Sequence, residues 1–301
     1  MQNMLEEIRE LRRQKNAVIL AHNYQPTEII ELADYMGDSL QLALKATEIS
    51  ADILVFCGVR FMAETAAILN PATKVLLPAQ DAGCPMADMI TAEDLISYKQ
   101  EHPDTVVVCY VNSSVEVKAE SDICCTSANA VQVLASIPKD KEILFVPDRN
   151  LGSWAAKQLG RTVHTWQGFC PIHQHAFDVT QVEEMRSRYP DHLLFAHPEC
   201  DASITDLADE VMSTGGMLKR AAEVDKMIIA TEKGLPDYLK KIYPQKSIVH
   251  LSPKAVCKDM KKITISHVVN ALRHEQYEVK VDADIAARAI NSLNRMLELS
   301  R

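Results

Sequence analysis

One pattern occurs three times along the chain, and this repeat constrains the fold more than any other feature of the sequence. A short apolar run ends at a polar residue three times, at His22, Tyr110 and His197, which are 88 and 87 residues apart. Each run is continuously apolar rather than alternating, which is typical of a strand buried on both faces in a parallel sheet. The repeat therefore predicts three related units, each beginning with a strand, at residues 18–21, 106–109 and 193–196.

Each unit then continues with the same order of elements. Helical stretches are predicted at 40–49, 128–134 and 217–222, second strands at 53–56, 143–146 and 227–230, and third strands at 75–77, 163–166 and 248–251. Alternation of strands and helices is typical of an α/β fold with parallel sheets and right-handed crossovers. We expect three Rossmann-like units around a pseudo-threefold axis, with the active site at the centre.

The unit boundaries coincide with repeated proline-containing linkers at 102–104 and 189–191. We predict a first unit at 1–102 that includes an N-terminal helix, a second at 103–190, and a third at 191–301. The third unit includes a C-terminal helix with an apolar stripe at Ile285, Ala289, Ile290, Leu293 and Met296. Threonines followed three residues later by an acid, at Thr91 and Thr180, predict the starts of two further helices.

Three cysteines stand in register, one near the end of each unit. Cys84, Cys170 and Cys257 are spaced 86 and 87 residues apart. Because ligands bind beyond the carboxyl ends of parallel strands, these thiols are expected to meet in one central cavity. Cys84 and Cys170 precede prolines, which favours a helix N-cap position and a lowered thiol pKa, and Lys258 is expected to do the same for Cys257.

Three converging thiolates are able to hold zinc or an iron–sulfur cluster. The remaining cysteines are interpreted as non-ligands: Cys57 and Cys109 lie in strands, and Cys124, Cys125 and Cys200 have no counterparts in register. The chain has no CxxC motif, so a zinc ribbon or a thioredoxin-type site is excluded.

Small hydroxyl residues also recur in register, at Ser39, Ser127 and Thr214. Each stands at the start of a predicted helix, where it acts either as an N-cap or as part of an anion site. Polar residues at the predicted strand ends add hydrogen-bond donors nearby: His22, Tyr110, Asn112 and His197. This set suits a substrate that carries carboxylates or a phosphate.

Composition narrows the classes of function. The net charge of −9, with no basic block, argues against nucleic acid as a partner, and no apolar run is long enough to span a membrane. The charged, amphipathic N-terminal segment does not look like a signal peptide, so a cytoplasmic protein is expected. Glycine-rich nucleotide-binding motifs do not occur.

At the level of motifs, nearly the whole chain resembles the quinolinate synthase family. The motifs that carry the resemblance are His22-Asn23-Tyr24-Gln25, Gly37-Asp38-Ser39, Phe61-Met62-Ala63-Glu64, Cys84-Pro85-Met86-Ala87, Tyr110-Val111-Asn112-Ser113, Cys125-Thr126-Ser127-Ala128-Asn129, Gly168-Phe169-Cys170, His197-Pro198-Glu199-Cys200, Ser213-Thr214-Gly215-Gly216 and Ala230-Thr231-Glu232-Lys233-Gly234.

The resemblance implies one 4Fe–4S cluster held by Cys84, Cys170 and Cys257, with one iron left open. It implies a transferase that condenses iminoaspartate (iminosuccinate) with dihydroxyacetone phosphate to give quinolinate, phosphate and water, in NAD biosynthesis from aspartate. Catalytic roles carry over to His22, Tyr24 and Glu199. Substrate-binding roles carry over to His22, Ser39, Tyr110, Val111, Asn112, Ser127, His197, Pro198, Glu199 and Thr214.

The resemblance also implies a functional link to the enzyme that supplies iminoaspartate, L-aspartate oxidase or aspartate dehydrogenase. Some family members carry a CxxC redox switch at the third ligand, whereas this chain has Cys257-Lys258-Asp259-Met260 there. Two alternatives stay open. One is another three-unit iron–sulfur enzyme, such as the reductase that ends the non-mevalonate isoprenoid pathway, and the other is a non-enzymatic iron–sulfur or zinc sensor.

Overall fold

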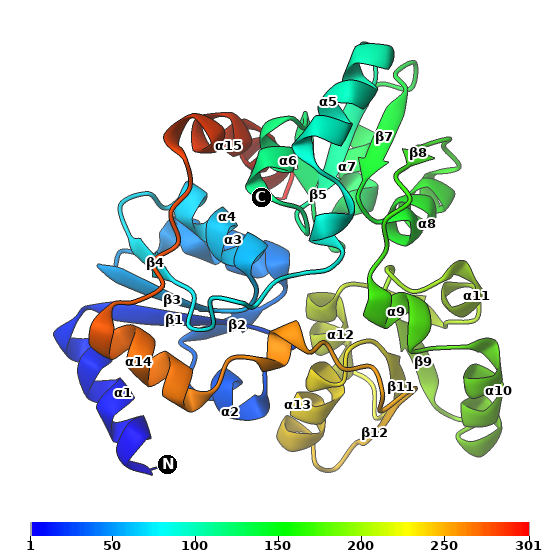
Figure 1. The fold of residues 1–301 in the computed structure, drawn as a ribbon. Coiled ribbons are helices and arrows are strands. Elements are labelled where there is room, and N and C mark those ends of the chain that lie inside the picture. Colours follow the sequence, from blue (N-terminus) through cyan, green and yellow to red (C-terminus); the bar gives the residue numbers. More distant parts are fainter. Residues whose placement is uncertain (1, 301) are drawn as a thin grey trace.

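Three four-stranded parallel sheets form the framework of the chain (Figure 1). The structure is a computed structural model that describes residues 2–300. The strand order is β2-β1-β3-β4 in the first sheet, β6-β5-β7-β8 in the second and β10-β9-β11-β12 in the third. The three sheets thus share one topology, and the predicted α/β fold with three Rossmann-like repeats is confirmed.

The strands of the repeat lie where the apolar runs predict them. The first strands are β1 (Ala17–His22), β5 (Val106–Tyr110) and β9 (Leu193–Ala196), the second are β3 (Ile53–Cys57), β7 (Ile143–Val146) and β11 (Lys226–Ala230), and the third are β4 (Lys74–Leu76), β8 (His164–Thr165) and β12 (Ser247–His250). Each sheet also has an edge strand that the sequence analysis did not predict: β2 (Tyr35–Gly37), β6 (Ile123–Cys125) and β10 (Glu210–Val211).

Helices connect and cover the strands of each sheet. Those of the first repeat are α1 (Gln2–Gln14), α2 (Thr27–Ile30), α3 (Ser39–Glu48), α4 (Arg60–Leu69), the 3-10 helix η1 (Ala87–Met89) and α5 (Ala92–Glu101). The second repeat has α6 (Val115–Ala119), α7 (Ala130–Ser136), α8 (Arg149–Leu159), α9 (Pro171–His175) and α10 (Val179–Arg188). The rest are α11 (Ala202–Thr205), α12 (Thr214–Ala221), α13 (Gly234–Ile242), the 3-10 helix η2 (Asp259–Lys261), α14 (Ile265–His274) and α15 (Ala283–Glu298).

The last helix of each repeat packs on the next unit rather than on its own. Helix α5 lies against α6 of the second unit, α10 against α11 of the third, and α14 returns to α1 and β3 of the first (Figure 1). This exchange closes the three units into a ring. The predicted boundaries at 102 and 190 fall just after α5 and α10. They mark where one sequence repeat ends and the next begins, and as domain boundaries they stay a prediction.

These exchanged helices begin with reciprocal side-chain caps. Thr91 and Asp94 form the predicted capping box at the start of α5. The prediction at Thr180 was wrong: α10 is capped by Asp178, whose side chain accepts the backbone N–H of Gln181. The hydroxyl of Thr180 is not used because the helix begins one residue earlier, at Val179.

Two apolar cores hold the ring together. The larger core contains residues of all three sheets, including the buried Phe56, Phe145 and Phe195, while a smaller one around Leu194 and Ile228 packs on the third sheet. Helix α15 crosses to the second unit, where it packs on α6 and β6. None of the helices in residues 2–300 has the length and apolar character needed to cross a membrane.

Candidate active site

The carboxyl ends of strands from all three units surround one pocket. Together with the solvent at its mouth, the pocket has about 610 Å³ of space that protein atoms do not occupy. Most of the predicted site residues line it: His22, Tyr24, Ser39, Cys84, Tyr110, Asn112, Ser127, Cys170, His197, Glu199, Thr214 and Cys257. Val111 and Pro198 are not among its lining residues, and Val111 lines a smaller neighbouring cavity beside Ser39.

Two of the three in-register hydroxyls occupy the first turn of a helix, but none is its N-cap. The caps are Asp38 for α3, Asn129 for α7 and Ser213 for α12, so the N-cap interpretation was wrong. Ser39 and Thr214 are the first residues of their helices, and Ser127 lies in the turn before α7. Asp38 and Ser213 cap α3 and α12 with their side chains, so the hydroxyls of Ser39 and Thr214 are not needed as caps, and all three hydroxyl residues line the pocket.

Asp38 holds two of these helix N-termini together across a unit boundary. One carboxylate oxygen accepts the N–H of Gln41 in α3 at 3.0 Å. The other accepts the hydroxyl of Ser213 at 2.9 Å and the N–H of Gly215 at 3.3 Å, both at the start of α12. A single buried carboxylate therefore brings Ser39 and Thr214 to the same side of the pocket.

Each of the three pocket thiols begins a tight turn. Cys170 is the N-cap of α9 and is followed by Pro171, as the sequence predicts. Cys84 and Cys257 are not caps, because the short helices η1 and η2 begin three and two residues later. Each sulfur nevertheless accepts a backbone N–H from three residues onward, at Ala87, His173 and Met260.

Burial, not the helix N-terminus, dominates the acidity of these thiols. It raises the pKa of Cys84 to about 12 and that of Cys257 to about 11, and it raises the pKa of Cys170 as well. The predicted lowering was therefore wrong for the protein without a metal. The thiol of Cys257 raises the pKa of Cys84 further, and the thiol of Cys84 raises that of Cys170, so each of these two pairs lies within electrostatic reach.

Three thiols from three units, enclosed in one buried pocket, fit a metal centre as a donor set. Buried thiols with raised pKa values become thiolates when metal ions replace their protons. The other five cysteines do not line the pocket and are fully buried elsewhere: Cys57, Cys109, Cys124, Cys125 and Cys200.

Glu199 is the centre of the hydrogen-bond network in the pocket. Its carboxylate accepts the hydroxyl of Tyr110 at 2.5 Å and faces Nδ1 of His173 at 2.7 Å. Burial alone would raise the pKa of Glu199, but the hydrogen bonds that its carboxylate accepts from His173 and Tyr110 lower it below its usual range. Glu199 is therefore ionised.

Two imidazoles are held in the same way by the residues that follow them. Nδ1 of His22 accepts the N–H of Tyr24 at 3.1 Å, and Nδ1 of His197 accepts the N–H of Glu199 at 3.4 Å. Burial lowers the pKa of each histidine to about 3, so both are neutral. With Nδ1 as the acceptor, the proton lies on Nε2, and each ring is able to donate a hydrogen bond to a ligand.

Tyr24 and Thr231 form a second polar cluster on the pocket wall. The hydroxyl of Tyr24 lies 2.6 Å from that of Thr231 and 3.4 Å from Nε2 of His173. Burial raises the pKa of Tyr24 well above its usual value, so the phenol keeps its proton. Elsewhere in the pocket lining, Oδ1 of Asn112 is buried and has no hydrogen-bond partner among the described residues, which is typical of a group reserved for a ligand.

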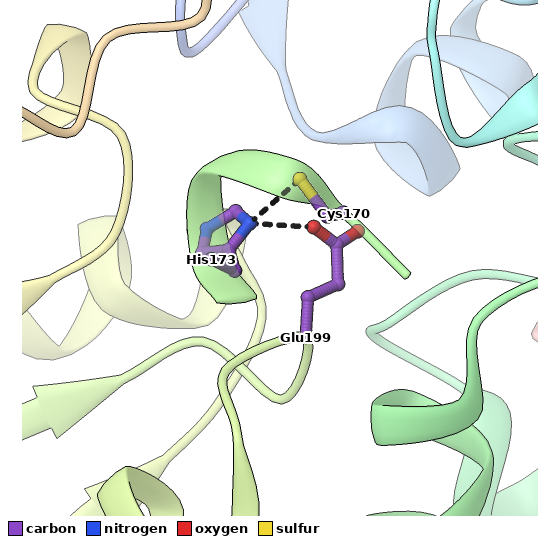
Figure 2. Close-up of side chains that lie close together, drawn as sticks. All are labelled: Cys170, His173 and Glu199. Carbon is purple, nitrogen blue, oxygen red and sulfur yellow. Dashed lines mark hydrogen bonds and ion pairs between the residues drawn. The ribbon is translucent and has the colours of Figure 1, made fainter. Parts of the chain in front are cut away.

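His173 is a site residue that the sequence analysis missed. Its ring stacks on that of His197 with centroids 4.7 Å apart, and its two nitrogens face Glu199 and Thr231. Figure 2 shows the ring of His173 directed at both Cys170 and Glu199, with Nδ1 3.2 Å from the sulfur. The available signal was its position three residues after Cys170, since residues i and i+3 share a helix face.

Cys170, His173 and Glu199 also form a candidate site for a single metal ion. Their ligand atoms all lie within 4.8 Å of one another, and a thiol, an imidazole and a carboxylate are all ligands of zinc. The site shares Cys170 with the set of three thiols, so the two arrangements compete for one sulfur.

Comparison with known proteins gives one consistent result. A family model described as quinolinate synthetase A protein (NadA) matches residues 6–298. A quinolinate synthase of Alkaliphilus metalliredigens is 50% identical over 300 residues, covering 99% of this chain and 98% of the relative. Quinolinate synthase 2 of Methanosarcina acetivorans is 47% identical, covering 98% and 95%, and a quinolinate synthase of Geobacter metallireducens is 47% identical, covering 98% and 97%.

Proposed function

The chain belongs to the quinolinate synthetase A family, and we therefore propose that it condenses iminoaspartate with dihydroxyacetone phosphate to form quinolinate. The reaction balances when one phosphate and two molecules of water leave and no electrons are exchanged. The observation that carries the proposal is the meeting of three thiols, one from each repeat, with an ionised Glu199 in one pocket. The proposed class is a transferase that needs an iron–sulfur group for its dehydration steps.

We propose that Cys84, Cys170 and Cys257 hold one 4Fe–4S cluster. With three protein ligands, such a cluster keeps one iron free to act as a Lewis acid toward a substrate carboxylate or a departing hydroxyl. The donor set supports this choice over the single-ion site, because Cys84 and Cys257 would otherwise have no role in the pocket. The choice is testable by metal content.

The substrate anions are proposed to bind at the hydroxyls and imidazoles of the wall. Ser39 and Thr214 are the first residues of α3 and α12, where the helix dipole favours an anion. His22 and His197 each present an Nε2–H group, and Asn112 offers an amide. Tyr110 and Ser127 complete the proposed substrate set. Val111 and Pro198 stay predictions from the family resemblance, since neither lines the pocket.

Glu199 is the proposed general base, and its neighbours keep its carboxylate ionised and in a fixed orientation. Hydrogen bonds from Tyr110 and His173 fix the carboxylate and stabilise its charge in a buried site. Tyr24 keeps its proton and is proposed as the donor for the tautomerisation of the triose. His22 lies beside Tyr24, with ring centroids 4.8 Å apart, and is proposed to assist there.

The experiment is an anaerobic assay of the iron–sulfur-loaded protein. Iminoaspartate is generated in the reaction mixture, dihydroxyacetone phosphate is added, and quinolinate and phosphate are both measured. We expect the two products in equal amounts, and none when either substrate is omitted. Protein that holds an iron–sulfur cluster but forms no quinolinate would contradict the proposed function, and a stoichiometric content of zinc in place of iron would favour a sensor.

A further inference from the structure

The loop that carries Cys257 is held by two consecutive residues that follow strand β11. The N–H of Lys233 donates to the carbonyl of Ala255 at 2.8 Å. The side chain of Glu232 accepts the N–H of Cys257 itself, with Oε1 at 3.1 Å. The backbone of the third thiol is therefore fixed by a carboxylate from a different strand end.

The second oxygen of Glu232 connects this loop to the first unit. Oε2 accepts the N–H of Gly234 at 2.7 Å and the ammonium of Lys261 at 3.0 Å. The same ammonium donates to the carbonyl of Tyr24. The side chain of Glu232 is only 1% exposed. This buried ion pair thus links the loop of Cys257 to the loop that carries Tyr24.

The space around the pair admits no larger residue at position 234. A Cβ on Gly234 would lie 2.6 Å from Nζ of Lys261 and 2.8 Å from both Oε2 of Glu232 and the carbonyl oxygen of Tyr24. The glycine lets the backbone approach the carboxylate closely enough to donate to it. The hydrogen bonds around this ion pair therefore depend on three residues, Glu232, Gly234 and Lys261.

The second unit holds its own cysteine in the same way. Asp148 stands two residues after the end of β7, just as Glu232 stands two residues after the end of β11. The two positions are equivalent, because the last residues of these strands, Val146 and Ala230, pair with equivalent residues of β5 and β9. The buried carboxylate of Asp148 accepts the N–H of Cys170 at 3.2 Å. Repetition in a second unit argues that the contact serves the cysteine rather than local packing.

The first unit departs from this pattern. Val59 occupies the equivalent position after β3, and its side chain has no hydrogen-bond acceptor. A carboxylate from the third unit replaces it, because Oδ1 of Asp259 accepts the N–H of Gly83 at 3.3 Å, next to Cys84. Asp259 lies two residues after Cys257, so the loops of the first and third thiols are joined directly.

We propose that Glu232 is a positioning residue for the metal centre, with Asp148 as its counterpart in the second unit. It fixes the backbone of Cys257 before any metal binds, and through Lys261 it sets the distance between that thiol and Tyr24. This inference rests on the proposed three-cysteine site and deepens it. Partners of ligands typically change metal affinity by about 10–100-fold when removed.

The test compares Glu232→Ala and Glu232→Gln with a control, Glu210→Gln, which removes a partly exposed ion pair with Arg220 in the same unit, away from the pocket lining. Loaded proteins are mixed anaerobically with an iron chelator, and cluster loss is followed by visible absorption. We expect loss to be about 10–100-fold faster in Glu232→Ala than in the control. Glu232→Gln should be intermediate, because its amide oxygen still accepts the N–H of Cys257.

A second measurement uses the metal-free proteins, so it does not depend on the cluster. Alkylation by iodoacetamide, resolved by peptide mass, should become faster at Cys257 in Glu232→Ala while the rate at Cys170 stays near that of the control. Equal acceleration at both cysteines would show general loosening and overturn the proposal, as would chelator rates equal to the control. If Glu232→Ala does not fold, Glu232→Gln decides by the same two criteria.

The outcomes also separate this inference from the function on which it rests. If the unmodified chain binds no iron and sulfide at all, the three-cysteine site fails. If it binds the cluster and the Glu232 variants behave as the control does, only the positioning role fails.

Discussion

Replacing Asp38 by alanine should weaken the contact between the first and third units. Asp38 caps α3 through Gln41, and it also accepts two donors at the start of α12, from Ser213 and Gly215. The substitution removes all three hydrogen bonds at once. It leaves a buried N–H group at Gly215 without its acceptor.

The expected loss in free energy of unfolding is the sum of two terms, one for the helix cap and one for the contact between units. Loss of an N-cap costs about 1 kcal/mol. Loss of the hydrogen bonds to a charged acceptor across the unit boundary adds about 1.5–3 kcal/mol, counted as one bond because the hydroxyl of Ser213 is free to rotate to another partner. The free energy of unfolding should therefore fall by roughly 2.5–4 kcal/mol.

The chain provides a matched control at α10. Asp178 forms the same capping box with Gln181, at 2.8 and 3.0 Å, but it is exposed and, among the described residues, has no contact of this kind with another unit. Asp178→Ala should cost only the capping term, about 1 kcal/mol. The difference between the two variants isolates the contact between units.

Urea unfolding of the metal-free proteins, followed by circular dichroism, measures both. With a slope of about 3 kcal/mol per M, the midpoint should fall by about 0.8–1.3 M for Asp38→Ala and by about 0.3 M for Asp178→Ala. Equal shifts in the two variants would refute the bridging role of Asp38.

Further predictions concern ligand binding and turnover. Single alanine substitutions of the three in-register hydroxyl residues, Ser39→Ala, Ser127→Ala and Thr214→Ala, should each keep the cluster. Each should weaken dicarboxylate binding by about 10–100-fold, because a charge-assisted hydrogen bond is lost. Unchanged affinity by calorimetry in all three variants would show that the hydroxyls bind no anion. Glu199→Gln should keep dicarboxylate binding and lose at least about 10²-fold in turnover, since the base is gone. His197→Ala should instead weaken dicarboxylate binding. Near-normal turnover in Glu199→Gln would leave Tyr24 as the leading proton carrier.

Much of the fold was predictable because buried parallel strands have a distinctive apolar signature. The missed strands β2, β6 and β10 lie at sheet edges and are only two or three residues long. The segment of β10, Glu210–Val211, is half-buried and polar enough to look like a loop. Edge strands of this length depend on pairing with a neighbour, which a local pattern does not reveal.

The candidate site was predictable where residues recur in register, and it was missed where the repeat breaks or the partner is distant. His173 has no counterpart histidine after Cys84 or Cys257, so the repeat gave no signal for it. The cap positions were off by one residue because Asp38 and Ser213, not their neighbours, have the extended backbone that an N-cap requires. Glu232 lies in one of the family motifs, but its contact with a backbone 25 residues away does not follow from the sequence.

The central claim is that three thiols from three repeats hold one metal cluster, and the iron and sulfide content of single cysteine variants tests it most directly. After anaerobic reconstitution we predict about four iron and four sulfide per chain in the unmodified protein and in Cys57→Ala, whose sulfur is buried in β3 away from the pocket. Cys257→Ala, Cys84→Ala and Cys170→Ala should each retain little of either. Full iron and sulfide in Cys257→Ala would contradict the account.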